Sequence, residues 1–275
     1  MTTTNIELTT GVAQQERKPA DLLTASRLLV ARQLRATVRQ PVWLVSGLMT
    51  PLLYLALFAP LLSGLGGGLA TTPGYAGGTV VDGFMPGMLV MFAFGCGTGT
   101  GWVVINELNA GVIERLRVSP VSRLAILLGT TIKDAIMFVI PAVIVVGVAA
   151  IFGFQVHPLG LLATFVLLAM LTATVSAAVG AVGLTVKQIG SIAAVVTTLQ
   201  LPLTLLAGIL LPMSLGPGWL RGLAHVNPLY YATEAARQMC SGLWGQAAWV
   251  GFAVIGVLLV ASLAWGNRVY NKVVA

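Results

Sequence analysis

Six long apolar stretches are the feature of this sequence that most limits how it can fold. Each holds twenty residues or more without a single Asp, Glu, Lys or Arg. A helix of about twenty apolar residues is long enough to cross the hydrocarbon core of a bilayer. We therefore expect an all-α membrane protein whose single transmembrane domain, residues 41–275, has six transmembrane helices and no ionisable side chain within a span. The stretches cover residues 42–63, 84–106, 135–154, 159–186, 189–213 and 247–266.

The composition supports this class. Hydrophobic residues make up 57% of the chain and charged residues only 8%. A soluble domain has about 25% charged residues, so this chain cannot cover itself in water. Cytosolic enzymes and disordered chains are excluded on this ground. The presence of only two cysteines, Cys96 and Cys240, also excludes a secreted module held together by disulfides.

The distribution of Lys and Arg predicts the orientation. If residues 1–20 form a flexible cytoplasmic N-terminus, thirteen of the fifteen basic residues fall on the cytoplasmic side, and only Arg221 and Arg237 fall outside. Such a bias is typical of cytoplasmic segments. We therefore expect both termini in the cytoplasm. Six basic residues lie between Arg17 and Arg39, directly before the first span, which favours anionic membrane lipids over nucleic acid as partners.

Residues 21–40 have the pattern of an amphipathic interfacial helix. Their apolar positions recur every seven residues, and three arginines share one flank: Arg32, Arg35 and Arg39. A simple basic anchor that sets the topology is the alternative.

Charged and apolar residues alternate between the second and third spans, from Glu107 to Arg123, and Pro120 interrupts the pattern. A short helix with both kinds of face could dock in a groove of a cytoplasmic partner. A solvated connecting loop is the alternative.

The segment between the fifth and sixth spans, residues 214–246, is too polar to span a membrane. Trp219, Tyr230 and Tyr231 suit the headgroup region. Asn227 before Pro228 predicts a helix start. Glu234 and Arg237 are spaced to pair one turn apart. We expect two short interfacial or re-entrant helices here.

Glycine occupies alternate positions of the second span at Gly95, Gly97, Gly99 and Gly101. Small residues let membrane helices pack closely, so packing is the plain interpretation and a glycine-lined substrate path is the alternative.

Several chemistries have no sequence support. None of the four lysines precedes Ser or Thr, so the phosphate-binding loop of an ATPase is missing. His157 and His225 lie in separate segments without metal-ligand spacing, and no Gly-x-Ser-x-Gly occurs. We therefore expect no catalytic residue, metal or cofactor in this chain.

These motifs resemble the permease subunits of type-2 ABC transporters, in the daunorubicin-resistance-like drug-export family. The first motif matches the family's Glu-x-x-x-Gly-x-x-Glu-Arg-Leu pattern and the Ser-Pro-x-x-Arg that follows it. Its matching residues are Glu107, Gly111, Val112, Glu114, Arg115, Leu116, Val118, Ser119, Pro120 and Arg123. The second resembles the family's external signature at residues 211–214, 217–220 and 227–232, followed by Glu234, Ala235 and Arg237. One departure is Asn109, at a position that is often acidic in relatives.

The resemblance implies a homodimer or heterodimer of permeases, bound to two copies of an ATP-binding cassette subunit that holds ATP and Mg, in a bacterial inner membrane. Residues 107–118 would be the coupling helix, and the first motif with Arg117 would contact the ATPase. Residues 21–40 would be the connecting helix, and 214–245 the external helical hairpin. The expected function is export of a lipophilic or amphipathic, drug-like compound. The alternatives are export of a lipid or lipid-linked polysaccharide, and a non-transporting membrane scaffold.

Overall fold

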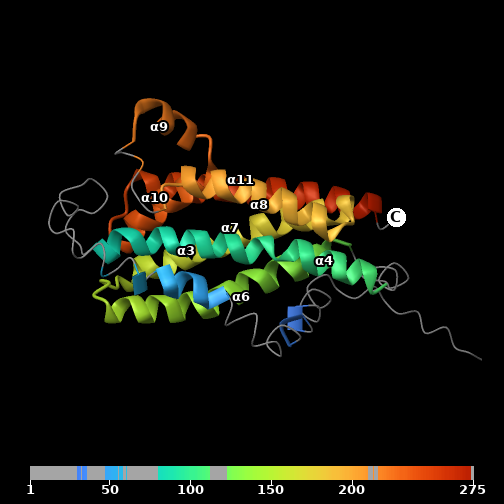
Figure 1. Ribbon diagram of the computed structural model, residues 1–275, viewed down its shortest axis with the longest axis horizontal. Helices are drawn as coiled ribbons and strands as arrows, with labels where there is room; N and C mark the ends of the chain where they lie inside the picture. Colours follow the sequence, from blue (N-terminus) through green and yellow to red (C-terminus); the bar gives the residue numbers. More distant parts are fainter. Residues whose placement is uncertain are drawn as a thin grey trace, which may run out of the picture.

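The computed structural model describes residues 30–31, 33–35, 47–54, 56–57, 60, 80–111, 123–209, 213 and 216–273. Within these ranges the regular structure is helical and no strand occurs, which confirms the all-α class. The main helices run nearly parallel along the long axis of the molecule (Figure 1). The described helices are α3 (Val80–Thr98), α4 (Thr100–Asn109), α6 (Arg123–Ile151), α7 (Pro158–Val186), α8 (Ile189–Leu206), α9 (Gly218–Ala224), α10 (Pro228–Cys240) and α11 (Gln246–Val273). Of these, the short α9 stands off the bundle at one end (Figure 1).

Five helical stretches among the described residues are long and apolar enough to cross a membrane. They correspond to the last five stretches expected from the sequence. The first expected span, 42–63, is described only at 47–54, 56–57 and 60, which are helical. The count of six spans therefore stays a prediction. The five are Val81–Asn109, Leu124–Ile151, Pro158–Val186, Ile189–Leu206 and Gln246–Lys272.

The expectation that no span carries an ionisable side chain is wrong. The third span was expected to begin at residue 135, with Lys133 in a cytoplasmic loop. Instead α6 begins at Arg123, so Lys133 and Asp134 lie inside it, with side chains only 6% and 7% exposed. The physical reason is that the two charges neutralise each other, since Lys133 Nζ lies 2.7 Å from Asp134 Oδ1. A charge-free stretch therefore underestimates the length of this span.

Helix α7 lies at the centre of the bundle and contacts α3, α4, α6, α10 and α11. Leu167, Leu168 and Leu171 on α7 are buried. Toward the other end of the helix, small residues such as Ala177 and Ala181 are fully buried. Small side chains allow neighbouring backbones to approach, which is how membrane helices gain packing energy when lipid is as apolar as the protein.

The glycines of the second span have different roles. A Cβ on Gly97 would lie 2.7 Å from Val175 Cβ and 2.8 Å from Thr172 O, so α7 packs directly against the backbone there. A Cβ on Gly101 would lie 2.8 Å from Val179 Cγ1. A Cβ on Gly95 would meet nothing within 4 Å. Close packing thus explains Gly97 and Gly101, whereas Gly95 faces open space.

Candidate functional site

A cavity of about 400 Å³ lies between the helical residues 47–54, α3 and α8. Its described lining is mostly aliphatic, aromatic and sulfur-containing, with a few hydroxyl and amide groups and no charge. A cavity of this size and polarity is in the range that holds a drug-sized ligand. The lining residues are Gly47, Thr50, Pro51, Tyr54, Phe84, Met88, Met91, Phe92, Gly95, Cys96, Gln200, Thr204, Leu205 and Ile209.

Helical periodicity builds the walls of this cavity. Phe84, Met88, Met91 and Gly95 recur at spacings of three and four, so α3 presents them on one face. Thr204 on the facing helix α8 donates to the Gln200 carbonyl at 2.8 Å, so its proton is already used within the helix. Flexible methionines adapt to ligands of different shape. The cavity therefore suits an uncharged or weakly polar molecule.

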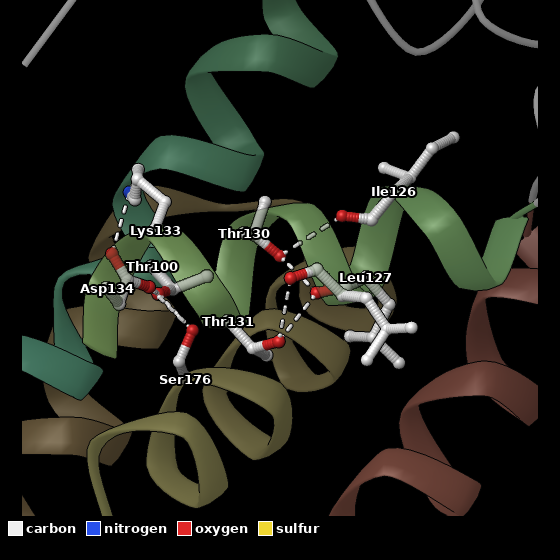
Figure 2. A network of polar contacts seen from close by, with 9 residues as sticks. Thr100, Ile126, Leu127, Thr130, Thr131, Lys133, Asp134 and Ser176 are labelled. Carbon is white, nitrogen blue, oxygen red and sulfur yellow. Dashed lines mark hydrogen bonds and ion pairs between the residues drawn. The ribbon is translucent and has the colours of Figure 1, made fainter. Parts of the chain in front are cut away.

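A buried polar cluster joins α4, α6 and α7 around the carboxylate of Asp134 (Figure 2). Thr100 Oγ1 and Ser176 Oγ both donate to Asp134 Oδ2, the latter at 2.6 Å. Lys133 pairs with the other carboxylate oxygen at 2.7 Å. Thr100 and Ser176 are at most 1% exposed. Because lipid offers no hydrogen bonds, these partners keep the ion pair tolerable inside a span.

Arg237 on α10 connects this helix to α3 and to the end of α8. It is 5% exposed, and its guanidinium reaches the ends of two other helices. Nε donates to Gly83 O at 3.1 Å on α3, and Nη2 donates to Gly208 O at 2.5 Å just after α8. Nη1 pairs with Glu234 Oε1 at 3.2 Å. Since Ile209, which lines the cavity, also accepts from Nη2 at 3.3 Å, Arg237 connects α10 to the cavity wall.

Asn227 makes a second connection between α10 and α8. Its Oδ1 accepts from Leu229 N at 3.0 Å, which caps the helix with Pro228 in the first turn. Its Nδ2 donates to Leu203 O at 2.6 Å. The predicted helix start at Asn227 and the predicted Glu234 to Arg237 pair are both confirmed.

The aromatic residues predicted for this segment lie on its outer side. Trp219 on α9 is 68% exposed. The rings of Tyr230 and Tyr231 pack against each other and against His225 at centroid distances of 5.2 to 6.5 Å. Burial, and then the neighbouring Glu234 carboxylate, raise the pKa of the Tyr230 phenol.

The predicted ATPase contacts are described only at their edges. Glu107 is part of the last turn of α4, and Gly111 has φ +67°, a left-handed conformation typical of a helix end. The coupling helix was expected over 107–118, so its first three residues belong to α4. Arg123 is the first residue of α6. Glu114, Arg115, Leu116, Arg117, Val118, Ser119 and Pro120 lie outside the described residues.

The connecting helix is described at few positions. Arg35 lies in helical backbone and is exposed, whereas Arg32 and Arg39 lie outside the described residues. In the described part of the chain, no group of three or more His, Cys, Asp or Glu side chains is placed to hold a metal.

Sequence reasoning missed the polar cluster and most of the cavity, although Gly95 on the cavity wall belongs to the glycine-lined path weighed as the alternative. The cavity lining comes from segments more than a hundred residues apart, such as Thr50 and Gln200. The cluster had a usable signal, because Lys133 and Asp134 are adjacent and of opposite charge.

Together, the apolar helices, the uncharged cavity and the internally satisfied polar groups define a multi-pass membrane protein. The family model described as ABC-2 type transporter matches residues 24–240. The chain therefore belongs to the ABC-2 type transporter family, as the sequence motifs indicated, and is a transport permease subunit.

Its relatives include proteins with permease names. It is 25% identical over 269 residues to the daunorubicin resistance ABC transporter permease protein DrrB1 of Streptomyces coeruleorubidus, covering 94% of this chain and 90% of the relative. It is 27% identical over 216 residues to the putative transport permease ycf38 of Cyanophora paradoxa, covering 78% and 73%. The ycf38 of Pyropia yezoensis is 27% identical over 227 residues, covering 81% and 76%.

Replacing Arg237 by Lys tests the link between α10 and the cavity wall. One ammonium cannot reach α3 and α8 together, so buried carbonyls lose their partner at a cost of about 2 kcal/mol. We expect the apparent melting temperature in detergent to fall by about 4–8 °C. Arg221→Lys, at an exposed position of α9, is the matched control and should change it by about 1 °C. Equal shifts for the two variants would contradict the assigned role.

Proposed function

We propose that this chain is the membrane subunit of an ATP-driven exporter that moves a lipophilic or amphipathic, drug-like compound out of a bacterial cell. The observation that carries the proposal is the uncharged cavity of about 400 Å³ between residues 47–54, α3 and α8. The name of the relative DrrB1, a daunorubicin resistance permease, supports the same class of compound.

The chemistry of the cavity favours this substrate class. A charged substrate would lose its hydration there without gaining a counter-charge from the described lining, and that desolvation is costly. An apolar compound with a few hydrogen-bonding groups would instead meet aromatic rings, thioethers and occasional polar atoms such as Gln200. Helix α8, one wall of the cavity, is largely exposed, with Ile192 and Val196 as its buried residues. This exposure supports lateral access from the lipid; the expected entry from the inner leaflet or the cytoplasm stays a prediction.

The basic residues support a cytoplasmic position for one end of the bundle. Arg123, Lys187 and Arg268 lie at or near the ends of α6, α7 and α11 on the side where α4 ends (Figure 1). Arg221 and Arg237 belong to α9 and α10 at the opposite side. By the positive-inside rule, the first side faces the cytoplasm, and α9 and α10 form the external hairpin.

The energy for transport comes from outside this chain. The sequence has no phosphate-binding loop, and ABC-2 family membership implies an ATP-binding partner. In the proposed assembly, two permeases of one or two kinds bind two ATP-binding subunits that hold ATP and Mg. Residues 107–118 contact those subunits, and closure of the subunits on ATP moves these segments. The bundle then changes from an inward opening to an outward opening.

A substitution that fills the cavity tests where the substrate binds. Gly95→Phe places a ring in open space on the cavity wall. We expect ATP-driven efflux of a lipophilic dye from membrane vesicles to fall by about tenfold or more, equivalent to a loss of about 1.4 kcal/mol. The ATPase rate without the dye should be unchanged. Gly147→Phe, also in open space but on exposed α6, is the control and should transport normally. Normal efflux by Gly95→Phe would remove the cavity from the pathway.

The ATPase contact is tested at its two central charges. We expect the double variant Glu114→Ala, Arg115→Ala to remain in the membrane but to lose most ATP-driven efflux, because the charges that fix the register of docking are gone. Efflux and ATPase activity are measured together, with Lys272→Ala at the exposed end of α11 as the control. Full efflux by the double variant would contradict the docking role of this segment.

A further inference from the structure

We propose that Asp134 is a positioning residue that locks the start of α4 to α6 and α7, so that movement at the ATPase contact reaches the cavity. The inference rests on the proposed function. It starts from the polar cluster of Thr100, Lys133, Asp134 and Ser176, which Figure 2 shows at the meeting point of three helices. We call this set the Asp134 clamp.

The clamp lies next to a weak point in the second span. Gly99 separates α3 from α4, and its carbonyl accepts a long helical bond from Val103 N at 3.4 Å, although its backbone stays in the helical region (φ −58°, ψ −26°). Thr98 Oγ1 donates to Gly95 O at 2.8 Å, and such back-bonding often bends a helix. Glycine in a helix interior also lowers its stability. The two parts of this span can therefore change their mutual angle at Gly99, whereas Thr100, the first residue of α4, is held by Asp134.

Both helices that flank the proposed ATPase contact meet at the clamp. Helix α4 runs from Thr100 to Asn109 and includes the first residues of that segment, and α6 begins at Arg123, just after it. With a rise of about 1.5 Å per residue, Thr100 and Asp134 lie about 15 Å from those helix ends. Because the clamp bonds α4 to α6, we infer that the end of α4 and the start of α6 move together and not independently.

The other side of the clamp leads to the cavity. Gly95 and Cys96 line the cavity and lie about one turn before Thr100. Movement of Thr100 therefore occurs within about one helical turn of the cavity wall. The clamp is rigid enough for this role, since both carboxylate oxygens of Asp134 are engaged and every member is buried. Hydrogen bonds are stronger and more costly to break in such a low-dielectric environment.

The native Cys96 provides a direct readout of the cavity. Cys240 is the only other cysteine of the chain, so a Cys240→Ala parent leaves Cys96 as its single thiol. The permease is kept in complex with its ATP-binding partner in lipid nanodiscs. The rate of Cys96 alkylation by N-ethylmaleimide is measured by mass spectrometry, without nucleotide and after trapping with ATP and vanadate. ATP hydrolysis by each complex is measured in parallel.

We expect trapping to change the alkylation rate of the parent by about tenfold, as for a large shift between two states. Thr100→Val keeps the shape of the side chain and the Lys133 to Asp134 pair but removes one bond of the clamp. It should reduce that change to about twofold or less while ATP hydrolysis continues. Ser176→Ala is the second variant and should act in the same direction.

Thr131→Val is the matched control. Thr131 is buried on α6, but its hydroxyl bonds only to Leu127 O and Leu128 O of the same helix. This variant should keep the full nucleotide response of the parent. A normal response of Thr100→Val and Ser176→Ala would overturn the proposal, and so would failure of both to fold, because the clamp would then be purely structural. A parent that does not respond to nucleotide would instead overturn the proposed function.

Discussion

Polar groups inside this bundle must find their partners within the protein, because lipid supplies none. Lys133 and Asp134 meet this constraint by pairing with each other, and the carboxylate takes its further bonds from Thr100 and Ser176 on two other helices. Arg237 meets it by donating to carbonyls at helix ends. Because the Asp134 carboxylate and the Arg237 guanidinium reach these partners only when several helices are in place, polar bonding specifies how the apolar helices are arranged.

Close packing around α7 complements these polar bonds. Apolar side chains alone would specify the arrangement weakly in lipid, where they gain nothing from leaving water. Gly97 and Gly101 bring the second span against α7, which allows Thr172 on α7 to donate to Ala93 O at 3.1 Å. Other threonine hydroxyls of α7 donate to carbonyls of the same helix. For example, Thr164 Oγ1 donates to Gly160 O at 2.8 Å. The result is a tightly packed centre, with the cavity confined to the side where Gly95 lies.

Much of the fold could be predicted from the sequence, since apolar length marks the spans and Asn227 with Pro228 marks the start of α10. The true start of α6 could not be found by looking for charge-free runs, because Lys133 and Asp134 cancel within the helix. The burial of Arg237 was also missed. Its partners are the main-chain carbonyls of Gly83 and Gly208. Every residue has such a carbonyl, so the sequence does not indicate which ones bind the guanidinium. The cavity depends on contacts between distant segments, so no local motif predicts it.

The most direct test of the account is to purify the permease from its native membranes in a mild detergent and to identify what accompanies it. An ATP-binding cassette protein is expected in the purified complex, with an ATPase rate that changes when a lipophilic compound is added. Such a complex would give this chain the energy source that its own sequence lacks. Purification of the intact permease without any ATP-binding protein would contradict ATP-driven export and favour a membrane scaffold.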